Sequence, residues 1–242
     1  MESKKNLTAV ITGASSDVGL AITKLLIDNG FHVLGHYNSN ANELLTLNHP
    51  SLFLQKADLT QFPEAENLIN VALEKLGHID VLINMVGPFS RSKDLLSVTP
   101  TEWRESIELN LNIAFTMCYY AKDHLIQAKG HILNFCFAGV ENIRAWTTAS
   151  SYAAAKAGLA VLTKSLAVSL AAHGVRVNAI CPGYIDFGHF SPAQTEEILK
   201  KIPQDRMCHP EEIISAVSWL LLQSPKHMTG SFMTLSGGWE HS

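Results

Sequence analysis

Residues 7–21 read LTAVITGASSDVGLA, a short apolar run followed by a turn that carries two glycines. The run Leu7–Ile11 is rich in β-branched residues and stops at Thr12-Gly13, which predicts a strand. From Gly19 to Asn29 the apolar residues recur at helical spacing. A glycine turn between a strand and a helix lets the backbone approach a pyrophosphate, which then faces the helix N-terminus. The stretch therefore predicts a dinucleotide-binding turn, with an ordinary tight turn as the alternative.

The rest of the chain repeats this alternation of short apolar runs and amphipathic segments. Further strands are expected over Phe31–Tyr37, Leu52–Gln55, Ile79–Ile83, His131–Phe135, Val175–Ile180 and Phe232–Leu235. Further helices are expected over Phe62–Leu76, Trp103–Ala128, Tyr152–Ala172 and Pro210–Leu222. Helix stops are expected at Gly30, Gly77 and Gly174, because each glycine stands just before a predicted strand. This pattern indicates an α/β fold, a doubly wound parallel sheet with helices on both faces, in a single domain over residues 1–242.

The composition is that of a globular protein with a sizeable core. Of the 242 residues, 47% are hydrophobic and 17% are charged. The formal net charge is −4 and there is no Lys/Arg block, so we expect no nucleic-acid partner and no membrane partner. The N-terminus has no apolar signal segment, and Lys164 and His173 interrupt the most apolar stretch, Gly158–Val175, which is not expected to span a bilayer. We expect a cytoplasmic protein.

Neither the cysteines nor the histidines form a recognisable metal or disulfide pattern. The four cysteines lie far apart and predict buried thiols of a reduced compartment: Cys118, Cys136, Cys181 and Cys208. The 11 histidines include no H-E-x-x-H motif, and His32 and His36 simply alternate along a strand. Cys208-His209 precedes Pro210-Glu211-Glu212, which is typical of a helix start. No metal site is predicted.

Polar residues follow other predicted strands at the same edge of the sheet. Asp58 and Leu59 follow the third strand, where a carboxylate could accept a hydrogen bond from an adenine amino group. Asn84, Val86 and Gly87 follow the fourth, where the chain can pass beside a cofactor. Open α/β sheets bind ligands at the carboxyl ends of their strands. Within the turn itself, the candidate cofactor contacts are Gly13, Ser15, Ser16, Val18 and Gly19.

The end of the second strand bears on the choice between NAD and NADP. An acidic residue that grips the ribose 2′-hydroxyl of NAD is expected about 20 residues past the turn. Here the strand ends in His36-Tyr37-Asn38-Ser39-Asn40, with no acid before Glu43. Because no acidic residue there would repel the 2′-phosphate of NADP, the sequence favours NADP(H), with Asn38 and Ser39 as candidate contacts. No Arg or Lys stands there to bind the phosphate, and NAD(H) stays open.

Tyr152 and Lys156 lie four residues apart at the start of a predicted helix, which puts phenol and ammonium on one face. A phenol titrates near pH ~10 and is a poor acid or base at neutral pH. A Lys cation about 4 Å away contributes roughly 4 kcal/mol at an effective dielectric of about 20, or about three pKa units. The pair therefore predicts an acid/base catalyst, with plain packing of the aromatic ring on the lysine stem as the alternative.

Together these residues resemble the short-chain dehydrogenase/reductase family. The motifs in the family's order and spacing are Thr12-Gly13…Gly19, Asp58, Asn84…Gly87, Asn110, Tyr152-x-x-x-Lys156, Pro182-Gly183 and Thr229-Gly230…Ser236-Gly237-Gly238. The resemblance covers residues 6–239 and implies a Rossmann-type domain that moves a hydride between nicotinamide C4 and a substrate carbon. It implies that Tyr152 is the general acid/base and that Lys156 holds the nicotinamide ribose and lowers the phenol pKa. Asn110 would anchor a water-linked proton relay, and Pro182, Gly183 and Ile185 would lie along the cofactor.

Two positions depart from the family pattern. The middle glycine of the first turn is Asp17, whose side chain we expect to cap the following helix, with a side chain that points to solvent as the alternative. The family's carbonyl-binding Ser is replaced by Phe137, and residues 131–146 contain no Ser or Thr. Losing an oxyanion donor commonly costs about 10²- to 10³-fold in rate. Three alternatives follow: another group (Tyr152, Cys136 or Ser150) polarises the substrate, the substrate is a C=N heterocycle, or the protein binds nucleotide without turnover.

Aromatic residues mark the loops that the family uses for substrate. Phe89, Phe137, Trp146 and Tyr184 are candidate substrate contacts, with Phe187 beside them, and suggest an apolar or flat pocket. By resemblance the expected substrate is a small molecule or an acyl thioester of the 3-oxoacyl type, with pteridine-like heterocycles as the alternative. Small residues on the Tyr152 helix (Ala153, Ala157, Gly158, Ala160) are compatible with the family's homodimers and homotetramers.

Overall fold

All the strands lie in one parallel sheet. The computed structural model describes residues 6–89 and 94–239. Its seven strands have the order β3-β2-β1-β4-β5-β6-β7. Their bounds are β1 Thr8–Thr12, β2 His32–Tyr37, β3 Leu52–Lys56, β4 Val81–Asn84, β5 His131–Phe135, β6 Arg176–Pro182 and β7 Phe232–Leu235. The order reverses between β1 and β4, so the carboxyl ends of these two strands form the switch point where such sheets bind ligands.

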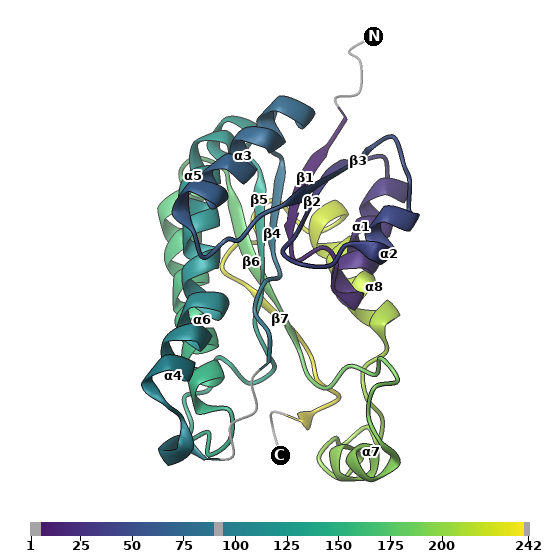
Figure 1. Cartoon of the computed structure of the whole chain (residues 1–242), viewed down its shortest axis with the longest axis vertical. Helices are drawn as coiled ribbons and strands as arrows, with labels where there is room; N and C mark the ends of the chain where they lie inside the picture. The colour runs from purple at the N-terminus through teal and green to yellow at the C-terminus, as the bar shows by residue number, and fades with distance from the viewer. Residues whose placement is uncertain (1–5, 90–93, 240–242) are drawn as a thin grey trace.

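Helices cover both faces of the sheet, as Figure 1 shows. On one face lie α3 (Phe62–Leu76), α5 (Ile113–Ala128) and α6 (Ser150–Ala171); on the other lie α1 (Asp17–Asp28), α2 (Asn42–Thr46) and α8 (Pro210–Leu222). Each face has its own apolar core, one around Leu82, Met117 and Ile132 and the other around Ile11, Ile83 and Val217. Cys118, Cys136 and Cys181 are buried free thiols, while Cys208 is only half-buried. The expected doubly wound α/β architecture is confirmed.

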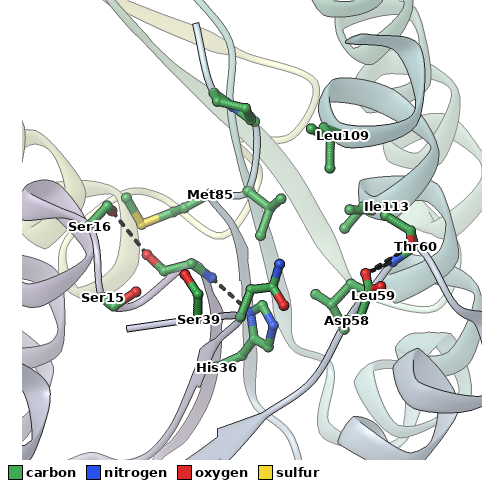
Figure 2. Close-up of a pocket in the computed structure, with 15 residues that line it drawn as sticks. Ser15, Ser16, His36, Ser39, Asp58, Leu59, Thr60, Met85, Leu109 and Ile113 are labelled. Atoms are coloured by element: carbon green, nitrogen blue, oxygen red, sulfur yellow. Dashed lines mark hydrogen bonds between the residues drawn. The ribbon is translucent and has the colours of Figure 1, made fainter. Parts of the chain in front are cut away.

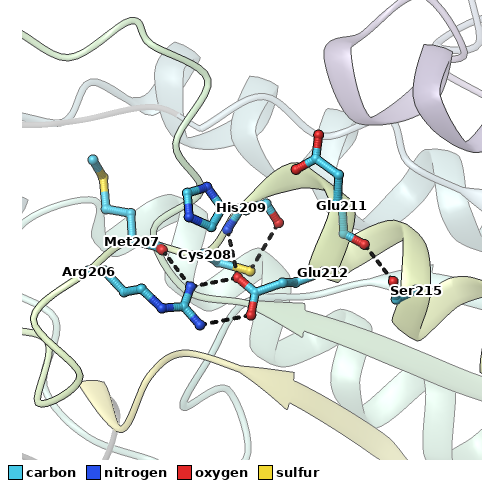
Figure 3. Close-up of polar contacts among 7 residues, drawn as sticks. All are labelled: Arg206, Met207, Cys208, His209, Glu211, Glu212 and Ser215. Atoms are coloured by element: carbon cyan, nitrogen blue, oxygen red, sulfur yellow. Dashed lines mark hydrogen bonds and ion pairs between the residues drawn. The ribbon is translucent and has the colours of Figure 1, made fainter.

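The predicted strands and long helices lie within a few residues of the observed ones. Gly30, Gly77 and Gly174 all adopt positive φ beside helix ends, where a left-handed residue stops the helix. Helix α8 starts where it was predicted, and the backbone N–H of His209 donates to Glu212 at 2.9 Å (Figure 3). Two short helices were not predicted, α2 and α7 (Pro192–Leu199), and neither has a long apolar stripe. In α7 a Ser191–Gln194 capping box defines the start instead.

The predicted long helix over residues 103–128 is interrupted. It consists of α4 (Pro100–Ile107), a π-helical turn η2 (Glu108–Asn112) and α5. A short 3-10 turn, η1 (Leu95–Ser97), precedes it. A π turn inserts one residue into the helical repeat and often marks a functional site. The inserted turn places Asn110 in the interior, at 1% exposure.

Helix α6 is long and apolar enough to cross a membrane by length and composition. The stretch expected not to span a bilayer, Gly158–Val175, overlaps α6 from Gly158 to Ala171 and continues past the end of the helix. In the structure α6 packs against β6 and η2, and its buried residues include Lys156 and Thr163. Core helices of this kind satisfy the same length and composition test.

Candidate active site

The glycine turn after β1 is shaped by its own backbone and by Ser16. Gly13 has φ +69°, a left-handed conformation that favours glycine. Ser16 is the N-cap of α1: its Oγ accepts from Gly19 N at 3.1 Å and donates to Gly13 O at 2.9 Å. The expectation that Asp17 caps this helix is wrong, because Asp17 already lies inside the first turn. Its exposed carboxylate instead contacts His189 Nε2 at 3.1 Å.

A cavity of about 360 Å³ opens beside this turn, at the switch point of the sheet (Figure 2). Nine of the predicted cofactor residues line it: Gly13, Ser15, Ser16, Asn38, Ser39, Asp58, Leu59, Val86 and Gly87. Six further lining residues were not predicted: His36, Thr60, Met85, Pro88, Leu109 and Ile113. Asp58 is oriented by Thr60, whose backbone N–H and hydroxyl donate to Asp58 Oδ1 at 3.1 and 2.8 Å. Figure 2 shows Ser15, Ser16 and Ser39 across the cavity from Asp58 and Ile113.

His36 lines the cavity and links two backbone segments beside it, at Gly13 and Ala57. Its ring is 2% exposed, and Nδ1 accepts from Gly13 N at 3.1 Å, while Nε2 lies 3.0 Å from Ala57 O. The two contacts require a neutral ring with its proton on Nε2, because Gly13 N–H and Ala57 O are a donor and an acceptor. Burial lowers the pKa of His36. A buried His at the end of a strand is the sequence signal that could have identified this role.

The remaining predicted cofactor residues do not line this cavity. Val18, Gly19, Pro182, Gly183 and Ile185 lie in the first turn of α1 or at the end of β6 and the loop after it. The Asn84 side chain points into the interior: its Nδ2 donates to Asn134 Oδ1 at 2.9 Å and to Cys118 Sγ at 3.4 Å. Because Asn84 ends β4 with its side chain toward the α5 layer, it supports the strand ends rather than the cavity.

Tyr152 and Lys156 stand one turn apart near the start of α6. Lys156 is buried at 3% exposure and its Nζ donates to Phe135 O at 2.7 Å, at the end of β5. The same Nζ lies 5.8 Å from the centroid of the Tyr152 ring. The Tyr152 ring contacts Phe89 at 5.1 Å and Phe137 at 5.8 Å between centroids. The phenol therefore stands between two apolar rings with an ammonium beside it.

The electrostatics of this pair differ from the expectation. Burial raises the pKa of the Tyr152 phenol above its usual value, and the same cause lowers the pKa of Lys156 to about 8. Burial therefore outweighs the lowering of the phenol pKa that was expected from Lys156. The physical reason is that Lys156 directs its ammonium to Phe135 O, while the rings of Phe89 and Phe137 desolvate the phenolate.

Asn110 and Gly87 complete the surroundings of Lys156. Asn110 Nδ2 donates to Ser106 O at 3.1 Å and to Pro88 O at 3.3 Å. Its Oδ1 is buried and has no hydrogen-bond partner among the described residues. A Cβ atom placed on Gly87 would lie 2.5 Å from Asn110 Oδ1 and 2.8 Å from Lys156 Nζ. Both polar atoms therefore border the same glycine, and an orphaned buried acceptor beside an ammonium fits a bound water or ligand hydroxyl.

The position that is predicted to lack the family's Ser carries an apolar ring. Phe137 is buried against Trp146, with centroids 4.9 Å apart, and against Tyr152. The alternative donors are already engaged. Ser150 Oγ donates to Trp146 O at 2.5 Å, and the buried Cys136 thiol shares a hydrogen bond with Cys181, which lowers the pKa of Cys136. Of the proposed carbonyl donors, only Tyr152 has no hydrogen bond to another described residue.

The donor set of the cavity fits a dinucleotide. Gly13 supplies a left-handed backbone next to a helix N-terminus, and His36 and Ser16 fix that backbone. Asp58 stands at the far side, where an adenine amino group would donate. Within residues 6–89 and 94–239, no group of three or more His, Cys, Asp or Glu side chains is arranged to hold a metal.

Comparisons with known proteins identify the family. A family model described as enoyl-(acyl carrier protein) reductase matches residues 13–240. The 3-oxoacyl-[acyl-carrier-protein] reductase of Salmonella typhimurium is 30% identical over 95% of this chain and 96% of its own. The cis-4-hydroxycyclohexanecarboxylate dehydrogenase of Sinomonas cyclohexanicum is 31% identical over 96% and 95%. A blue fluorescent protein from a metagenomic library, solved with NADPH, superposes with a TM-score of 0.87 at 25% identity, over 98% of this chain and 99% of its own. The chain is an oxidoreductase that belongs to the short-chain dehydrogenase/reductase family.

Proposed function

We propose that this protein is a cytoplasmic, NADPH-dependent reductase of carbonyl compounds, with a 3-oxoacyl-type thioester as the first substrate class to test. The observation that carries the proposal is that Asn110 and Lys156 meet at Gly87, next to the cavity after β1, with the Tyr152 ring centroid 5.8 Å from Lys156 Nζ. Three elements that are far apart in the sequence contribute to it. The substrate class rests on similarity to 3-oxoacyl reductases and on the apolar rings beside Tyr152.

In this proposal each residue has a separate task. When bound, the nicotinamide supplies the hydride for the substrate carbon. Tyr152 gives its phenolic proton to the carbonyl oxygen, and its hydroxyl also polarises that oxygen, since Phe137 cannot. Lys156 would hold the ribose hydroxyls beside the phenol. Asn110 Oδ1 anchors a water that returns a proton toward Lys156 and Tyr152, because this oxygen is buried and unpaired among the described residues.

NADPH is the proposed cofactor because of the polar residues at the end of β2. Asn38, Ser39 and Ser16 line the cavity there, and none of them carries a negative charge that would repel a 2′-phosphate. A similar fold has been solved with NADPH. Titration of the protein with NADPH and with NADH, followed at the nicotinamide absorbance band, tests the preference. Equal or tighter binding of NADH would overturn it.

Reduction of a flat C=N heterocycle, such as a pteridine, is the second candidate. The Tyr152 ring stands between Phe89 and Phe137, and parallel or edge contacts with such rings favour a flat aromatic substrate. A C=N bond also has less need of the missing Ser hydroxyl. Running the NADPH assay with 3-oxoacyl thioester, quinone and pterin substrates separates the two candidates.

We also propose that α5 and α6 join copies of this chain into a homodimer or homotetramer. Phe115, Tyr119, Val161 and Val168 are exposed on these two neighbouring helices. Val168→Glu would place a charge in this apolar surface and should shift the mass in light scattering toward the monomer. Leu45→Glu on α2, across the sheet, is the matched control. A wild type that is already monomeric would contradict the proposal.

A further inference from the structure

An arginine stands at the outer end of a row of aromatic rings that begins at Tyr152. Arg144 lies on the loop between β5 and α6, with its guanidinium carbon 4.8 Å from the Trp146 ring centroid and 5.8 Å from that of Trp239. Trp146 in turn packs edge-on against Phe137, which contacts Tyr152. The cation is therefore two rings away from the phenol. Trp239 also contacts Tyr184 at 5.1 Å, so the loop after β6 borders the same cluster.

The charge of Arg144 is not neutralised by a described carboxylate. Glu141, its near neighbour in sequence, pairs with Lys164 at 2.9 Å. Arg206 provides the contrast: Glu212 accepts from both of its terminal nitrogens, at 2.7 and 2.9 Å, as Figure 3 shows. Among the described residues no carboxylate oxygen lies within 4.0 Å of Arg144. Stacking on an indole fixes a guanidinium plane and leaves its N–H edge available for an anion.

Arg144 lies on a different part of the sheet from the residues that line the nucleotide cavity. The nucleotide cavity is lined by residues that follow β1, β2, β3 and β4 and by η2 and α5. Arg144 follows β5, and its aromatic partner Trp239 follows β7, on the other half of the sheet. An anion at Arg144 would therefore belong to the substrate and not to the dinucleotide.

We propose that Arg144 is the anion-binding subsite of this enzyme. Its substrate is a ketone whose apolar body lies along Phe137 and Trp146 and whose anionic group, a carboxylate or a phosphate, pairs with the guanidinium. Arg can form two parallel hydrogen bonds with a carboxylate or phosphate, which combine charge attraction with a fixed orientation of the anion. This inference rests on the proposed carbonyl reduction by Tyr152 and names the substrate class of that site.

The test compares charged and neutral versions of one ketone in the NADPH assay. The first pair is 4-oxocyclohexanecarboxylate and its methyl ester; the second is acetoacetyl-coenzyme A and the neutral acetoacetyl-N-acetylcysteamine. The quantity measured is the ratio of kcat/KM for the charged compound to that for the neutral one. Arg144→Gln should lower this ratio about tenfold or more, as loss of a charged hydrogen bond does. Arg144→Lys should retain part of the preference for the charged compound. Lys24→Gln, which removes an exposed cation from α1, is the matched control and should leave the ratio unchanged.

The outcomes distinguish failure of the proposed anion-binding subsite from failure of the proposed carbonyl reduction. A fall for the first pair identifies a carboxylate, and a fall only for the second identifies a phosphate. A ratio within twofold of wild type in Arg144→Gln for both pairs would overturn the subsite while carbonyl reduction stands. If no ketone is turned over, calorimetric titration of the NADPH-loaded protein with 4-oxocyclohexanecarboxylate decides: binding that Arg144→Gln abolishes keeps the subsite and refutes the reaction. Absence of binding refutes both.

Discussion

At the scale of single residues, His36 shows how one buried side chain can fix a binding turn. It is hydrogen-bonded to the backbone on both sides, to Gly13 N after β1 and to Ala57 O after β3. A protonated ring would present a second N–H to Gly13 N–H and lose that bond. Its lowered pKa is therefore consistent with a permanently neutral support for the turn.

His36→Ala should destabilise the protein by about 1–3 kcal/mol, because it leaves buried backbone groups without partners. It should also weaken NADPH binding, since Gly13 is no longer held. Urea unfolding and NADPH titration measure the two effects. His32→Ala is the matched control, because His32 lies on the same strand and its side chain hydrogen-bonds to the exposed Asn6. Equal effects of the two substitutions would contradict a special role for His36.

Phe137 occupies the position at which the resemblance to the family predicts a missing Ser, and this departure stays a prediction. The absence of a hydroxyl could be read from residues 131–146, and the structure fills the position with a ring against Tyr152. The pKa of Tyr152, in contrast, could not be predicted from the sequence. Spacing alone predicted a lowered value, but the rings that desolvate the phenol come from other loops, which no spacing rule reveals.

At the scale of elements, the π turn η2 brings Asn110 to the site. Alternating apolar runs were enough to predict all the strands and most helices, because buried parallel strands and amphipathic helices have distinct periods. The π turn was missed because the apolar pattern stays continuous through residues 103–128. The short helices α2 and α7 were missed because capping and turn geometry define them more than an apolar stripe does.

Substitution of Gly87 tests how closely the chain after β4 packs against η2 and α6. Gly87→Ala should lower kcat about tenfold or more, because the new Cβ would displace Asn110 Oδ1 and Lys156 Nζ from positions 2.5 and 2.8 Å away. Steady-state kinetics at saturating NADPH measure the effect. Gly30→Ala, also at positive φ but with no atom within 4 Å of the new Cβ, should cost stability without lowering kcat. Unchanged kcat in Gly87→Ala would refute the close packing.

At the scale of the whole molecule, buried neutral histidines link folding to pH. Burial lowers the pKa of His131 to about 3, and its ring lies 2.9 Å from Asn178 Nδ2. Since an unfolded His titrates near 6.5, the unfolded chain binds more protons between pH 6.5 and 3. The free energy of unfolding is therefore expected to fall as pH drops through this window, by up to about 1.4 kcal/mol per unit from His131.

Urea unfolding at pH 7, 6, 5 and 4 measures this dependence. His131→Gln should reduce the slope, because the side chain no longer gains a proton on unfolding. An unchanged slope would show that carboxylates, rather than His131, set the acid sensitivity of the fold.

The central claim is that Tyr152 transfers the proton in an NADPH-dependent reduction. The most direct measurement is Tyr152→Phe, assayed for NADPH consumption with the best carbonyl substrate and for NADPH binding by titration. General acid/base catalysis contributes about 10²- to 10⁴-fold, so turnover should fall by at least about 100-fold while the NADPH dissociation constant stays within about twofold of wild type. Turnover that survives the loss of this hydroxyl would contradict the account.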